Sequence, residues 1–197
     1  MTVNMKTVFD IDKTVAAVAY LAKMNKGSIS IFLLLKMLYS AERQAISEWQ
    51  RPITGDRFSS LPKGPILSRT YNLIKGEVLQ ANSDMVKWSK HFTPRKGNRI
   101  EILSEPDYDY LSKREIEALE HGFNEITALI EKHGQIVDVL HQNWPEWKNP
   151  QEVCGKLSMP LEIEEILSEF FCEDEEVEKI SLEIESVQSA KAALQVN

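Results

Sequence analysis

Cysteine is scarce in this chain of 197 residues, which contains only Cys154 and Cys172. The two lie 18 positions apart and outside any C-x-x-C pair. This spacing predicts reduced thiols in a cytoplasmic protein, with a disulfide between the two as the alternative. Stability then has to come from a packed core, which a chain of this length can supply.

Long apolar runs are also missing. The longest, from Ile29 to Tyr39, is about half of the ~20 residues needed to span a bilayer, and it contains Lys36. The first residues, MTVNMKTVFDIDK, hold no apolar segment beside a cleavage site. We therefore expect a cytoplasmic protein that is neither secreted nor inserted in a membrane.

Motifs for catalysis, metals and cofactors are absent as well. His133 and His141 are eight positions apart and Cys154 follows thirteen later, whereas zinc sites bring three or four ligands in closely spaced pairs. Cys154 and His141 could form a thiolate nucleophile only if the fold joined them. Lys63-Gly64-Pro65 lacks the spacing of a phosphate-binding loop. We expect no enzyme, no metal and no cofactor.

Apolar residues recur at helical spacing along most of the chain, which predicts a mainly α fold. We expect one compact helical domain over residues 1–197, with about six to eight helices and a small β-strand or hairpin element. Residues 161–194 are expected to form an acidic C-terminal helical extension. The expected helices run from Asp12, as N-cap, to about Asn25, from Ser28 or Ser30, as N-cap, to Gln50, from Pro65 to about Asn82, from Asp84 to His91, from Ser112 to about Lys132, from Gln135 to His141, from Leu161 to about Phe170, and from Asp174 to about Leu194.

The β element is expected around Arg99 to Leu103, where apolar and polar residues alternate after a turn. The regions of Ile53 and Phe58 are its candidate partners. Ser112 and Glu115 form the S-x-x-E pattern of a capping box, which marks the start of the long helix.

Charge is distributed unevenly along the chain. Residues 161–185 hold eleven acidic side chains and one lysine, a net charge of −10, whereas the whole chain has a net charge of −7. Residues 85–100 contain five Lys or Arg and no acid. This basic segment, 87–99, with Trp88 and Phe92 available for base stacking, is typical of a nucleic-acid-binding regulator. The sequence pI of about 5.2 argues against that alternative.

The stretch from Lys36 to Tyr71 carries the strongest pattern. A Lys-x-x-Tyr pair is followed by Pro-Ile-Thr-Gly-Asp, then by Gly-Pro, then by a tyrosine. In this order and spacing, the stretch closely resembles the Panacea domain of SocA-like antitoxins and phage-associated GepA-type proteins. The residues that carry the resemblance are Lys36, Tyr39, Pro52, Ile53, Gly55, Asp56, Gly64, Pro65 and Tyr71. The resemblance is densest over about residues 10–75, and Pro62 departs from the pattern.

The resemblance implies an antitoxin of a bacterial or phage toxin–antitoxin system. Such a protein neutralises a cognate protein toxin by direct contact, and the toxin is encoded by the adjacent gene. The sequence identifies neither the toxin nor the oligomeric state.

Two features of the chain suggest specific contacts. Lys36 lies in an apolar helix and needs a partner, for which Asp56 and Tyr39 are the candidates. The candidate partner-binding residues are His141, Trp144, Trp147, Glu173, Glu175 and Glu176. The tryptophans could equally cover the core. The glutamates could equally be solvated charges at a helix N-terminus.

Overall fold

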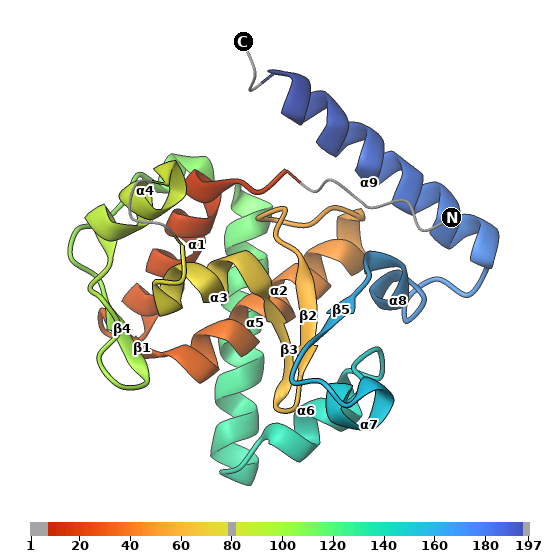
Figure 1. The fold of residues 1–197 in the computed structure, drawn as a ribbon, viewed down its shortest axis with the longest axis horizontal. Coiled ribbons are helices and arrows are strands. Elements are labelled where there is room, and N and C mark those ends of the chain that lie inside the picture. Colours follow the sequence, from red (N-terminus) through yellow and green to blue (C-terminus); the bar gives the residue numbers. More distant parts are fainter. Residues whose placement is uncertain (1–7, 79–81, 195–197) are drawn as a thin grey trace.

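The computed structural model describes residues 8–78 and 82–194, and it is 60% helical (Figure 1). The described residues contain nine α-helices: α1 Ile11–Met24, α2 Ile31–Trp49, α3 Ser68–Lys75, α4 Ser83–His91, α5 Lys113–His133, α6 Val137–Asn143, α7 Pro150–Cys154, α8 Ile163–Leu167 and α9 Asp174–Leu194. A 3₁₀-helix spans Tyr108–Tyr110. The predicted fold class, mainly α with a small β element, is confirmed.

Helix α2 lies at the centre of the core. It contacts α1, α5, α8 and the strands beside it, and Leu34 and Leu38 are at most 1% exposed. A helix that is apolar on nearly every side needs neighbours around its whole circumference. Helix α5 is one of these neighbours, and it approaches α2 at Gly122, where a Cβ would overlap the Met37 carbonyl of α2. The absence of that carbon lets the two helices pack closely.

The strands form two small antiparallel sheets. In the first, β1 (Ser28–Ser30) pairs with β4 (Arg99–Glu101). In the second, the order is β3 (Gly64–Leu67), β2 (Phe58–Leu61), β5 (Met159–Leu161). The central strand β2 joins residues far apart in the sequence, since Phe58 is opposite both Leu67 and Leu161. Figure 1 shows this sheet between the helical body and α8.

Three local predictions were wrong. Strand β4 pairs with β1 and not with the region of Ile53 or Phe58. Pro65 lies inside strand β3 rather than at a helix start, because Lys63 completes a hairpin turn and α3 begins only at Ser68. The N-cap of α1 is Asp10 rather than Asp12, since the Asp10 carboxylate accepts a hydrogen bond from the Lys13 N–H at 3.0 Å.

Two predicted helices are shorter than expected, because α3 ends at Lys75 before Gly76 and α8 spans only Ile163–Leu167. Two other predicted features agree with the structure. The capping box of α5 is present between Ser112 and Glu115, and α9 spans the predicted range. Its Val177, Ile180 and Ile184 are buried against the domain. In the part of the chain described, no helix is both long and apolar enough to cross a membrane.

Candidate partner-binding site

Lys36 is buried beneath the β2–β3 hairpin. Its Nζ donates a hydrogen bond of 2.8 Å to the Pro65 carbonyl and lies 5.7 Å from the centre of the Phe32 ring. Burial lowers the pKa of Lys36 to about 7. Neither sequence candidate is its partner, so the predicted pairing of Lys36 with Asp56 or Tyr39 was wrong. A backbone carbonyl carries no side-chain signal in a sequence, which is why the actual partner was missed.

Asp56 instead holds the start of α3. Its Oδ1 accepts hydrogen bonds from the Arg57 and Arg69 N–H groups, and its Oδ2 accepts from the Thr70 N–H and hydroxyl, all at 2.7–2.8 Å. Burial raises the pKa of Asp56, and these donors oppose the rise. The N-cap position of α3, Leu67, makes no side-chain cap hydrogen bond. Asp56 therefore supplies from a distant turn the cap that α3 lacks locally.

Glu42 was missed in the sequence, although it fixes the same turn from the opposite side. Its carboxylate accepts from the N–H groups of Ile53 at 2.6 Å and Thr54 at 2.9 Å, and from the Thr54 hydroxyl. Burial raises the pKa of Glu42 to about 7. A helical acid with no base three or four positions away could have signalled a backbone-binding role, but many exposed acids have the same appearance.

Tyr39 takes part in a second buried network. Its hydroxyl donates a 2.7 Å hydrogen bond to Glu146, which also accepts from Arg43 Nε at 2.8 Å. Burial, with the Glu146 charge next in importance, raises the pKa of Tyr39. The Trp144 ring packs edge-on against Tyr39 with centroids 4.9 Å apart. Trp144 is only 1% exposed, so its side chain lies in the core.

His141 and Trp147 form a stacked pair, with ring centroids 3.4 Å apart and planes 9° from parallel. The indole Nε1 of Trp147 donates to the Leu61 carbonyl at 2.8 Å, which ties this loop to the end of β2. Burial, and then the Lys36 charge, lower the pKa of His141. Both rings are half-buried.

The remaining residues of the motif are also placed by packing. Ile53 is buried, and a Cβ on Gly55, whose φ is +65°, would overlap the Val8 carbonyl. Tyr71 is half-buried beneath the Lys75 ammonium, 4.5 Å from its ring centre. Most side chains of the motif are thus used inside the fold, where they set the hairpin, the turn and the start of α3.

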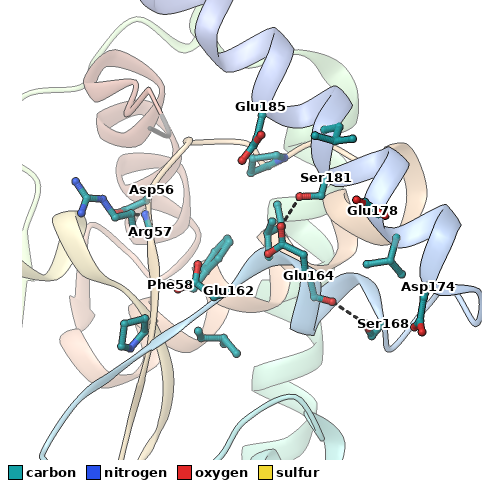
Figure 2. Close-up of a pocket in the computed structure, with 16 residues that line it drawn as sticks. Asp56, Arg57, Phe58, Glu162, Glu164, Ser168, Asp174, Glu178, Ser181 and Glu185 are labelled. Atoms are coloured by element: carbon teal, nitrogen blue, oxygen red, sulfur yellow. Dashed lines mark hydrogen bonds between the residues drawn. The ribbon is translucent and has the colours of Figure 1, made fainter. Parts of the chain in front are cut away.

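A groove lies beside this scaffold, between α9 on one side and Pro52–Phe58, β5 and α8 on the other (Figure 2). Its volume is about 900 Å³. Phe58, Leu161, Ile163 and Val177 give it apolar surface. Five acidic side chains outside the buried turn line it: Glu162, Glu164, Asp174, Glu178 and Glu185. We define these lining residues as the acidic groove.

The carboxylates of the acidic groove have little to neutralise them. Among the described side chains that line the groove, Arg57 is the only basic one. Glu164 accepts a hydrogen bond from the Ser181 hydroxyl, which is neutral (Figure 2). Burial, and then the nearby Glu164 and Glu165 charges, raise the pKa of Glu162. The groove therefore carries a concentrated negative charge.

Of the predicted acidic residues at the start of α9, Glu175 extends the same surface. Glu173, Glu175 and Glu176 are all exposed. Glu175 lines a second, shallow hollow of about 380 Å³ on α9, together with Glu178, Leu182, Glu183 and one base, Lys179. Because Glu178 and Leu182 line both hollows, the two form one continuous surface. The structure does not join these glutamates to His141 or Trp147 by any hydrogen bond in the described residues.

The aromatic residues of the basic segment, 87–99, are buried and not available for base stacking as the sequence suggested. Trp88 and Phe92 are 3% and 1% exposed, so neither can stack on a base. Lys87 is paired with Asp12 at 2.5 Å, and Arg99 donates to the Ser28 carbonyl at 2.8 Å. The aromatic half of the predicted stacking patch is therefore part of the core.

The possible catalytic and metal ligands stay apart. Cys154 and Cys172 are free thiols at exposed positions. Cys154 Sγ donates to the Pro150 carbonyl at 3.2 Å rather than to His141, whose Nε2 has no hydrogen-bond partner among the described residues. Across residues 8–78 and 82–194, no three His, Cys, Asp or Glu side chains are grouped so that they could hold a metal ion.

Comparison with known families agrees with the motif. The model of the antitoxin SocA-like family, Panacea domain, matches residues 34–148, which include the hairpin, the turn and both buried networks. No curated protein and no solved structure matches the chain. Since the family model covers more than half of the sequence, this chain belongs to the SocA-like antitoxins with a Panacea domain.

Proposed function

We propose that this protein neutralises a cognate protein toxin by binding it directly, in the cytoplasm and without catalysis. The observation that carries the proposal is the match of residues 34–148 to the SocA-like antitoxin family. The toxin is expected to be the product of the adjacent gene. The protein then acts as a binding surface on a rigid scaffold.

The chemistry of the motif supports a binding role. Lys36, Tyr39 and Asp56 would be natural catalytic groups in an open cleft, but each is at most 1% exposed. Their polar atoms form hydrogen bonds within the fold. Buried polar groups that are fully engaged in this way specify a unique structure. In this chain they hold the hairpin and α3 in place and leave the outer surface to meet a partner.

The test is co-expression with the adjacent gene. That gene alone should arrest growth, and co-expression of this protein should restore it. The two proteins should also co-purify at a fixed stoichiometry. In the matched control, the start codon is removed from the gene of this protein, and the adjacent gene is left unchanged. Any rescue by the RNA is then separated from rescue by the protein. An adjacent product that is not toxic, or a toxic one that is never relieved, would refute the proposal.

A further inference from the structure

Helix α9 presents two different faces. The first, with Val177, Ile180 and Ile184, is at most 7% exposed and packs on the domain. The second runs through positions three or four apart, Glu175, Glu178, Leu182 and Glu185, and residues at that spacing share one side of a helix. Leu182 is 57% exposed at the middle of this acidic row.

The acidic groove continues from this second face. Leu182, Glu178 and Glu185 form part of its α9 wall, and Glu162 belongs to the opposite wall (Figure 2). Its apolar surface comes from several elements, including Phe58 of β2 and Leu161 of β5. A large exposed apolar side chain surrounded by charge at the edge of a hollow has the layout of an interface centre with a polar rim.

The charge of the groove decides which partner fits. Among the described ion pairs of the chain, none joins Arg57 to the carboxylates that line the groove with it. Bringing carboxylates together costs free energy that a cationic partner would recover, and nucleic acid or an acidic membrane surface would be repelled. An apolar ligand alone would leave this charge unmatched.

We propose that the acidic groove and the Glu175–Glu185 face of α9 bind a Lys- and Arg-rich segment of the toxin that places one large apolar side chain on Leu182. The inference rests on the proposed function and adds the surface and the chemistry of its partner. Opposite charges raise the association rate, and added salt reduces that gain because exposed charges are screened over ~10 Å at 0.1 M. The apolar contact contributes mainly to the lifetime of the complex.

Zero-length carbodiimide cross-linking of the purified complex tests the location. The reagent joins a carboxylate to a lysine amine in direct contact, and mass spectrometry identifies the joined residues. We expect toxin lysines to be joined to Glu162, Glu178 or Glu185. The inference would be overturned if the toxin lysines were joined only to other acids of this chain. It would also be overturned if the groove carboxylates were joined to lysines of a second copy of this chain.

A pair of matched variants tests the energetics. The first, Glu175→Gln, Glu178→Gln and Glu185→Gln, removes three charges from the proposed surface. The control, Glu101→Gln, Asp109→Asn and Glu131→Gln, removes three charges at exposed positions on other elements. Association of the toxin should slow several-fold at low salt for the first variant and remain close to wild type for the control.

Leu182→Ala should instead speed dissociation several-fold at every salt concentration. Circular dichroism shows whether each variant is folded. Equal binding by wild type, both charge variants and Leu182→Ala would refute the proposal that the groove binds the toxin, but it would leave the antitoxin role intact. Failure of the wild-type protein to bind the toxin at all would refute the proposed function itself.

Discussion

Lys36 Nζ lies 2.9 Å from the point that a Cβ on Gly64 would occupy. Gly64 also has φ +99°, a conformation that L-residues rarely adopt. The glycine is therefore required twice, by its own backbone and by the buried amine beneath it. The Gly-Pro and Lys-x-x-Tyr parts of the motif, 28 positions apart, form one structural unit.

The first prediction concerns that contact. Gly64→Ala should lower the free energy of unfolding by about 2–4 kcal/mol, because backbone strain is joined by overlap with Lys36. Gly97→Ala is the control, since Gly97 also has a positive φ but no described atom lies within 4 Å of its Cβ position. It should cost only the ~1–2 kcal/mol of the left-handed backbone. Urea unfolding measures both, and equal losses would contradict the contact.

The second prediction uses the pKa of Lys36. Burial lowers this pKa from 10.5 to about 7, so the unfolded chain holds a proton that the folded protein has lost between those two pH values. The stability of the wild type should therefore rise with pH above about 7, relative to Lys36→Met. The slope is at most about 1.4 kcal/mol per pH unit.

Unfolding free energies of the two proteins at pH 6.5 and pH 9 give the required difference. Glu42, whose pKa burial raises to about 7, titrates in both proteins and cancels in the comparison. A difference between wild type and Lys36→Met that does not change with pH would show that Lys36 keeps its ordinary pKa in the folded protein.

The third prediction concerns Glu146, which holds Tyr39 and Arg43 together. Glu146→Gln keeps the size of the side chain but removes the charge that Arg43 faces at 2.8 Å. Hydrogen bonds to charged groups contribute about 1.5–3 kcal/mol, so we expect a loss of that order in thermal or urea unfolding. Glu152→Gln, at an exposed position of α7, should change stability by less than about 0.5 kcal/mol.

The fourth prediction concerns the tie between Trp147 and β2. Trp147→Phe keeps an aromatic ring to stack on His141 but removes the Nε1 donor that binds the Leu61 carbonyl at 2.8 Å. The cost should be about 1 kcal/mol. Amide hydrogen exchange in Leu61–Gly64 should increase, while exchange in α5 should not. Unchanged exchange at the hairpin tip would show that the indole does not fix it.

The sequence predicted those parts of the fold that depend on local signals. The capping box at Ser112 and Glu115, the long apolar stripe of α5 and the amphipathic pattern of α9 each contain enough information in one stretch of chain. The family motif was also recognisable, because several weak elements occur in a fixed order. Local patterns of this kind are the most reliable evidence that a single sequence offers.

The missed features depend on contacts between distant segments. Strand β5 has only three residues and contains Pro160, so nothing local marks it as a partner for Ser59 of β2. The acidic groove was not predicted because it too is formed by distant segments, although the net charge of residues 161–185 was apparent from the sequence. Residues 161–185 stand out in the sequence, but only the fold places them opposite Phe58 and Arg57.

The fifth prediction corrects the pairing that the sequence favoured between Lys36 and Asp56. Lys36 donates to the Pro65 carbonyl, whereas the Asp56 carboxylate accepts four hydrogen bonds, from Arg57, Arg69 and Thr70. In residues 8–78 and 82–194, the two side chains share no hydrogen-bond partner. Each can therefore be changed without removing an interaction made by the other.

Asp56→Asn should be costly by itself. The asparagine amide has only one acceptor oxygen. Its NH₂ group would therefore replace either Oδ1 or Oδ2 of Asp56 and would face the donors that bind that oxygen. If the amide replaces Oδ2, the Thr70 N–H and hydroxyl, both now 2.7–2.8 Å away, lose their acceptor. Each buried donor left without a partner costs about 1–3 kcal/mol. We expect α3 to lose protection from hydrogen exchange before the rest of the protein.

The double variant Lys36→Met/Asp56→Asn then decides between the two arrangements. With separate partners, its change in unfolding free energy should equal the sum of the single changes within about 0.5 kcal/mol. Measurement at pH 9, above the lowered pKa of Lys36, limits any long-range charge effect. A coupling energy well above that value would mean that Lys36 and Asp56 interact directly, and the assignment of Pro65 as the partner of Lys36 would then be wrong.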